Sequence, residues 1–105
     1  VVTCEITTAT RNVSLNGVTV RESQYIGLID DKLSVAGESI ETVARDTLRK
    51  AGADKYELIT LYYGDQITKD KAQMLADTLA RDFPEQEFQI VNGDQPLYPY
   101  IISVE

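Results

Sequence analysis

Residues 58–65, with the sequence LITLYYGD, decide the fold class of this chain. The apolar and β-branched run that starts at Leu58 is nearly continuous, which is typical of a strand covered on both faces. We expect this strand to span residues 56–63 and to end at Gly64, where the backbone can turn sharply. The chain then leads towards a helical pattern. A strand that passes through a short turn into a helix indicates an α/β protein.

Two segments show the periodicity of amphipathic helices. The first helix is expected over residues 39–51, with Ser39 as its N-cap and Gly52 just beyond its end. The second is expected over residues 68–83 and is stopped by Pro84. Its first turn carries Lys69 and Lys71, whose charges oppose the helix dipole. The apolar stripes are Ile40, Val43, Ala44, Thr47, Leu48 and Ala51, and then Ala72, Leu75, Ala76, Leu79 and Phe83.

Strand-like segments surround these helices. Asn16 and Gly17 favour a type I′ turn between strands 13–15 and 18–20, and residues 30–32 join strands 25–29 and 33–36. Further strands are expected over residues 87–91 and 100–104. Together the segments predict an α/β fold, a single-domain sandwich over residues 1–105. It has a mixed β-sheet, N-terminal β-hairpins, two main helices (about 39–51 and 68–83) and a C-terminal strand.

The composition argues against several classes of function. The chain has 105 residues, 10 basic and 17 acidic, so its net charge of −7 disfavours nucleic acid as a partner. It contains no histidine, which removes Ser-His and Cys-His pairs and every metal site that uses histidine. Neither a dinucleotide-binding glycine motif nor a phosphate-binding loop occurs. We therefore predict no catalytic, cofactor-binding or metal-binding residue in this domain.

Further features of the sequence concern the cellular compartment, metal binding, membrane insertion and the extent of the chain. The single cysteine, Cys4, lies in an alternating run and is expected to be a buried, inert side chain, in keeping with a reducing, cytoplasmic compartment. Asp30 and Asp31 are expected to form a solvated turn rather than a cation site. The sequence has no apolar stretch long enough to span a membrane. Because the chain starts at Val1 in strand-like sequence, we expect it to be a fragment of a longer protein.

One candidate contact segment lies at the end of the central strand. It comprises Tyr62, Tyr63 and Asp65 around Gly64, and partners often bind at the carboxyl ends of strands in open α/β sheets. The alternative is an ordinary strand-to-helix turn in which the two tyrosines belong partly to the core.

The second candidate segment spans residues 92–100, with Pro96 and Pro99 holding it extended. Rigidly held aromatic side chains make good interface anchors. The predicted contact residues are Gln95, Leu97, Tyr98 and Tyr100. Alternatively, the prolines protect a sheet edge and the tyrosines pack inward. After Arg81 the chain has five acidic residues and no basic one, so a partner at this end would be basic.

These two segments resemble a known family. The residues Tyr62, Tyr63 and Gly64, together with the tail GDQPLYPYIISVE at 93–105, are similar to the C-terminal, DegV-like domain of FakA, the kinase subunit of bacterial fatty acid kinase. This family is related to dihydroxyacetone kinase. The similarity extends through the early strands, including Asn16, Gly17 and the stretch 25–30, and covers all 105 residues. Many family members have a second glycine where this chain has Asp94.

The resemblance implies a role in a two-component fatty acid kinase. The N-terminal domain of the parent kinase chain would bind ATP and magnesium, and the kinase would phosphorylate a fatty acid held by the DegV-family protein FakB for phospholipid synthesis. The present domain would be non-catalytic and would dock FakB. It would also adjoin the other domains of the parent chain.

Two other functions remain open. A DegV-like fold could bind an acyl chain or another small molecule itself, which would need a large apolar cavity. An independent enzyme that used carboxylates would need a deep cleft and a carboxyl group with a raised pKa.

Overall fold

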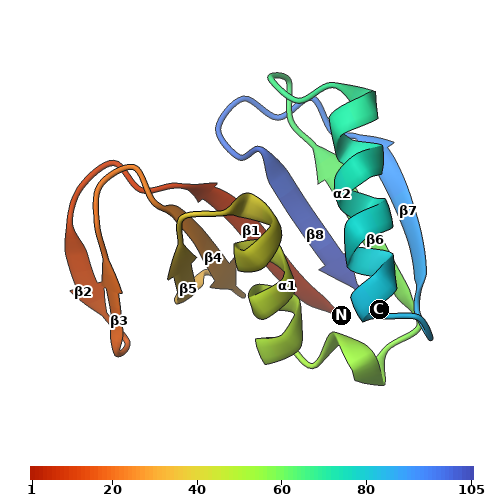
Figure 1. The fold of residues 1–105 in the computed structure, drawn as a ribbon, viewed down its shortest axis with the longest axis horizontal. Helices are drawn as coiled ribbons and strands as arrows, with labels where there is room; N and C mark the ends of the chain where they lie inside the picture. Colours follow the sequence, from red (N-terminus) through yellow and green to blue (C-terminus); the bar gives the residue numbers. More distant parts are fainter.

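Six strands form one mixed sheet in the order β5-β4-β1-β8-β6-β7, and β2 and β3 form a separate hairpin (Figure 1). In this computed structural model of residues 1–105, only β6 and β7 pair in parallel. The strands are β1 (Val2–Thr8), β2 (Val13–Leu15), β3 (Val18–Val20), β4 (Tyr25–Ile29), β5 (Lys32–Gly37), β6 (Leu58–Tyr63), β7 (Glu87–Asn92) and β8 (Tyr100–Val104).

Both long helices, α1 (Ile40–Lys50) and α2 (Lys69–Asp82), lie against the same face of the sheet (Figure 1). A short 3₁₀ turn, η1 (Ala53–Lys55), follows α1. The predicted N-cap Ser39 is confirmed, because its Oγ accepts from Thr42 N at 3.4 Å, and the structure shows that Thr68 caps α2, where its Oγ1 accepts from Lys71 N at 3.2 Å. These side chains satisfy amide groups that the first turn of a helix leaves without a partner. The two predicted helices and the α/β class are thus confirmed.

The main core lies between the helices and the sheet. Its fully buried side chains include Ile6 of β1, Leu48 of α1, Leu79 of α2 and Ile102 of β8. Burying side chains of this size contributes about 1.5–3 kcal/mol each. Cys4 is fully buried in the same core, as predicted. Burial raises the pKa of its thiol to about 12, and the negative charges of Asp30 and Glu5 add to the shift.

The central strand is covered differently on its two faces. Helices cover only one face of β6, so the expected covering of both faces is confirmed only in part. Ile59 and Leu61 point into the helix-side core, whereas Leu58 and Tyr62 are half-buried on the opposite face. Thr60 on that face is buried at 3% exposure and accepts a hydrogen bond from Gln89 Nε2 at 2.9 Å. Neighbouring strands therefore shield this face without a second helical layer.

The hairpin β2–β3 turns as predicted. Asn16 and Gly17 adopt positive φ angles of 55° and 77°, which a two-residue type I′ turn requires. The second hairpin also turns on two residues, Asp30 and Asp31, and Lys32 already belongs to β5. The β2–β3 hairpin projects from the edge of the main sheet (Figure 1). Its buried Val20 forms a small second core with Ala9 and Leu33.

Candidate partner-binding site

The two predicted contact segments, 31 positions apart at their first residues, meet at one end of the sheet. Antiparallel pairing of β6 with β8 places Tyr63 opposite Tyr100, so the end of one segment adjoins the end of the other. We call residues 62–65 and 93–100 the paired loops. The long connection between β7 and β8 folds back over the turn that follows β6 (Figure 1).

Backbone hydrogen bonds hold the paired loops together. Gly64 N donates to Pro99 O at 2.9 Å, and Asp65 N donates to Gln95 O at 3.0 Å. On the other side, Tyr63 O accepts from Gly93 N at 3.0 Å and from Asp94 N at 3.1 Å. These bonds satisfy backbone groups that would otherwise need water, and they make the two loops one rigid unit.

Gln95 adds a side-chain clamp to this unit. Its Nε2 donates to Tyr62 O and to Tyr98 O, each at 2.9 Å. One amide thus connects the end of β6 with the far side of the second loop. The sequence prediction gave Gln95 a partner contact, but in the structure its Nε2 is engaged within the chain, and the side chain is half-buried.

Gly64 is the point of closest approach. A Cβ atom built on it would lie 2.6 Å from Tyr98 O and 2.8 Å from Gln95 O, both of which are backbone atoms. Side chains do not tolerate such distances, so the second loop can pack here only on a glycine. The role expected for Gly64 was a sharp turn; close packing of the backbone is the additional requirement that the structure reveals.

The predicted site residues differ in exposure. Asp65 is exposed, and Leu97 is 77% exposed. Tyr62, Gln95 and Tyr98 are half-buried.

Two of the predicted site residues lie in the core instead. Tyr63 is 9% exposed and Tyr100 is 3% exposed, and both belong to the main core cluster. This is the inward packing that the sequence left open as an alternative. Their side chains do not offer area to a partner, so the predicted contact role remains only for the exposed and half-buried residues of the paired loops.

Sequence reasoning missed a third contribution to this surface, the end of β1. Thr7, Thr8 and Thr10 line a shallow pocket of about 290 Å³ beside the paired loops, and Thr7 Oγ1 donates to Leu97 O at 3.4 Å. The pocket exists because β1 pairs with β8, which sets Ile6 opposite Tyr100. The only available signal was the cluster of threonines at the end of the first strand.

The family of the chain follows from comparison with known proteins. The sequence model of the FakA-like C-terminal family, which describes the C-terminal region of FakA-like fatty acid kinase subunits, matches residues 1–105. The chain belongs to this FakA-like C-terminal family. The predicted resemblance is confirmed.

Relatives of this FakA-like domain are considerably longer than the chain. It is 27% identical over 101 residues to protein YloV of Bacillus subtilis, covering 96% of this chain and 18% of the relative. It is 27% identical over 100 residues to the uncharacterized protein SAR1202 of Staphylococcus aureus, covering 95% of this chain and 18% of that protein. The uncharacterized protein SH1689 of Staphylococcus haemolyticus is 25% identical over 100 residues, with the same two shares. The chain therefore spans less than a fifth of the length of these relatives.

Asp94, where the resemblance led us to expect a second glycine, adopts the backbone conformation that glycine favours. Its φ angle is +53°, in the left-handed region. Aspartate tolerates this region better than most residues with a side chain. The turn can therefore keep the geometry that a glycine would give it.

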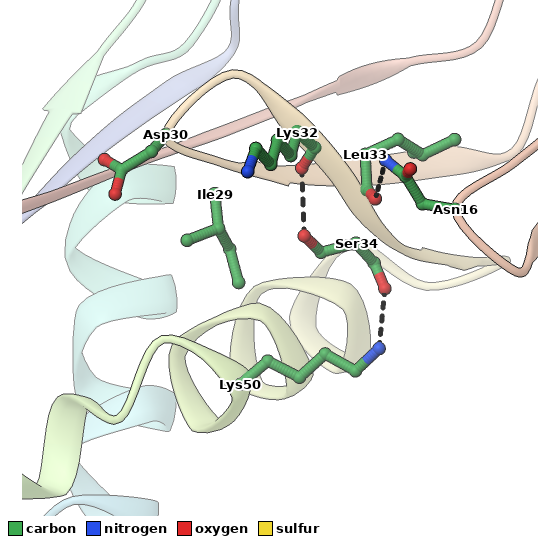
Figure 2. Close-up of a pocket in the computed structure, with 7 residues that line it drawn as sticks. All are labelled: Asn16, Ile29, Asp30, Lys32, Leu33, Ser34 and Lys50. Carbon is green, nitrogen blue, oxygen red and sulfur yellow. Dashed lines mark hydrogen bonds between the residues drawn. The ribbon is translucent and has the colours of Figure 1, made fainter.

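The most voluminous pocket of the FakA-like domain lies at the other end of the sheet, away from the paired loops. It measures about 510 Å³ and lies around the turn between β4 and β5. Figure 2 shows that its polar groups contact the chain itself: Lys50 Nζ donates to Ser34 O at 2.9 Å, and Asn16 Nδ2 donates to Leu33 O at 3.4 Å. These two hydrogen bonds connect α1 and the β2–β3 hairpin to β5. We therefore assign the pocket a structural role.

Metal-ligating side chains do not gather at any point of the domain. No group of three or more cysteine, aspartate or glutamate side chains is arranged to hold a metal ion. None of the helices is both long and apolar enough to cross a membrane.

Proposed function

We propose that this domain docks FakB, the acyl-carrying protein of the DegV family, within a two-component fatty acid kinase. Membership of the FakA-like C-terminal family supports a place in a kinase subunit. In this proposal the domain is itself non-catalytic. ATP and magnesium bind a domain elsewhere in a longer, cytoplasmic parent chain, and docking presents the fatty acid to that domain for phospholipid synthesis.

The observation that carries the proposal is the convergence of the paired loops. Hydrogen bonds through Gly64, Asp65 and Gln95 hold them in one conformation, so little conformational entropy would be lost on binding. On this rigid base Leu97 is 77% exposed. An apolar side chain on a preorganised loop is the kind of group that fills a partner's pocket.

Charge supports the same surface. Asp65 and Asp94 are both exposed in the paired loops. The net charge of the chain is −7. A basic patch on FakB would complement it and would speed association. Such steering weakens as salt is added, because the Debye length falls to about 8 Å at physiological ionic strength.

An acyl-chain site inside the core receives less support. All of the four pockets open to solvent, whereas a domain that encloses a long acyl chain in its core would need a large apolar cavity. The most apolar of them is a groove between α1 and α2. An independent carboxylate enzyme is also weakly supported, since the only carboxyl with a clearly raised pKa, that of Glu5, owes it to burial and to its neighbour Asp31 on an exposed turn.

The test is a binding titration of purified FakB against this domain and its variants. Leu97→Ala, Tyr98→Ala and Asp65→Lys should each weaken binding at least several-fold while leaving the far-ultraviolet circular dichroism unchanged. Leu15→Ala and Glu22→Lys are matched controls, because Leu15 is 54% exposed on the distant hairpin and Glu22 is an exposed carboxylate outside the loops. Both controls should bind like the wild type.

Two outcomes would contradict the proposal. Absence of wild-type binding at high micromolar FakB would remove docking as the function of this domain. Unchanged binding by all three loop variants, with the fold intact, would place the contact elsewhere on the domain.

A further inference from the structure

A groove separates α1 from α2 on the helix-covered side of the molecule. It has a volume of about 390 Å³ and is the pocket with the most apolar lining. Strand residues lie beneath it and helix residues form its walls. The apolar lining residues are Tyr25, Ile40, Ile67, Met74, Leu75 and Tyr100. The volume lies within the range usual for sites that bind small molecules.

Tyr100 gives this groove a polar group without a partner. Its side chain is 3% exposed and lines the groove, and its hydroxyl forms no hydrogen bond within the chain. The only fully buried side-chain polar atom that lacks a partner is Arg45 Nε, so the Tyr100 oxygen retains access through the groove. A ligand that fills the groove would exclude water from this hydroxyl, and leaving the donor without an acceptor would then be costly. The hydroxyl therefore favours a ligand that brings an acceptor oxygen.

The hydroxyl of Tyr100 stays protonated over the whole physiological range. Burial, with a smaller contribution from the charge of Glu41, raises its pKa to about 12. A protonated phenol can donate a hydrogen bond, whereas a phenolate cannot. An acceptor on the ligand, such as a carbonyl oxygen, would satisfy this donor.

The charged residues of the groove constrain the ligand's head group further. Glu41 lies on the α1 wall, where its carboxylate accepts from Ser39 Oγ at 2.8 Å, and Lys71 lies on the α2 wall. Lys71 forms no ion pair within the chain. Glu41 is the charge that acts on the Tyr100 hydroxyl, so it would repel an anionic head placed there, and an alkylammonium head has no lone pair that could accept from the phenol. A neutral head avoids both penalties.

We propose that the groove between α1 and α2 binds a small amphiphile with an aliphatic chain and a neutral carbonyl head, an acyl amide or acyl ester, whose oxygen accepts a hydrogen bond from Tyr100. The chain lies along Ile67 and Leu75. Met74, which is 69% exposed, adapts to it at the mouth because methionine is flexible and polarizable. The groove shares only Tyr100 with the paired loops, and its binding of the amphiphile does not depend on FakB binding.

The experiment compares three probes with the same eight-carbon chain: octanamide, octanoate and octylammonium. Each is titrated into the domain below its micellar concentration while carbon-proton NMR follows the methyl groups of Met74, Ile40 and Ile67. Octanamide should shift these signals saturably and bind more tightly than the two charged probes. Tyr100→Phe should weaken octanamide binding about threefold to tenfold, the effect of one neutral hydrogen bond.

Two further variants test whether octanamide binds in the groove. Tyr98→Phe removes a hydroxyl outside the groove and should leave octanamide binding unchanged. Met74→Lys changes an exposed side chain, so folding is preserved, and its charge at the mouth should weaken binding. The proposal is overturned if the charged probes bind as tightly as octanamide, if neither Tyr100→Phe nor Met74→Lys alters the affinity, or if no methyl signal in the groove shifts.

Discussion

The side-chain amide of Gln95 donates to the backbone carbonyl of Tyr62 at 2.9 Å, and this bond links two segments that are 33 residues apart in the sequence. The same nitrogen reaches Tyr98 O at 2.9 Å. A single side chain thus couples the end of the central strand to the loop that carries Leu97. The rigidity of the candidate surface depends on internal contacts of this kind. Each of them can be removed by a single substitution.

Replacing Gln95 with alanine should destabilise the protein by about 1–3 kcal/mol, because two carbonyl oxygens in a partly buried setting lose their donor. Urea denaturation at neutral pH measures the change in the free energy of unfolding. Gln66→Ala is the matched control, since Gln66 is an exposed neighbour in the same pocket that forms no hydrogen bond through its side chain. Equal stabilities of the two variants would show that the clamp contributes nothing.

Gly64→Ala should also be destabilising, by about 1–3 kcal/mol, because the added methyl group would meet the carbonyl oxygens of Gln95 and Tyr98. Backbone atoms cannot move aside as the end of a side chain can. Gly37→Ala provides the comparison, since its Cβ would meet only the Val43 Cγ2 methyl at 3.1 Å. Thermal melts of both variants check this, and a smaller loss for Gly64→Ala than for Gly37→Ala would refute the role of close packing.

Much of the fold was predictable because its signals are local. Ser39 and Thr68 cap helices within a few residues of themselves, and the Asn16-Gly17 pair defines its own turn, so helix and hairpin positions could be predicted from short windows. The order of the strands in the sheet could not be predicted in this way. Pairing of β1 with both β4 and β8 depends on contacts between distant segments, for which this sequence carries no local pattern.

The candidate site was predictable in outline for the same reason. Turn residues and prolines marked both loops, but the side on which each tyrosine would lie was undetermined. Alternation along a strand requires Tyr62 and Tyr63 to point to opposite faces, and only the position of the helices decides that Tyr63 is the buried one. The contribution of Thr7 depended on strand pairing and was therefore missed.

Asp94 should respond to substitution according to backbone conformation rather than charge. Its φ of +53° is costly for most side chains, so Asp94→Ala should lower stability by about 1 kcal/mol. Asp94→Gly should be nearly neutral, because glycine adopts this conformation freely but loses more entropy on folding. Chemical denaturation of the two variants gives the comparison. A larger loss for glycine than for alanine would contradict the conformational explanation.

Stability should fall as the pH rises from about 9 towards 12. Burial raises the pKa of Cys4 from 9.0 to about 12 and that of Tyr100 from 10.0 to about 12, so the folded chain retains protons that the unfolded chain releases. Each group contributes stability that is complete below its unfolded pKa and is lost as the pH climbs through its folded pKa. Urea denaturation at about pH 8 and about pH 11 measures the loss.

Tyr100→Phe and Cys4→Ala should each reduce this alkaline loss, since each removes one of the two titrating groups. Tyr98→Phe is the control, because it removes a phenol that lies outside the core, and its loss between the two pH values should equal that of the wild type. The effect is assessed as the difference between the two unfolding free energies within each variant, so that any change common to both pH values cancels. If Tyr100→Phe and Cys4→Ala both lose as much stability as the wild type, burial of the two groups does not govern the alkaline limit.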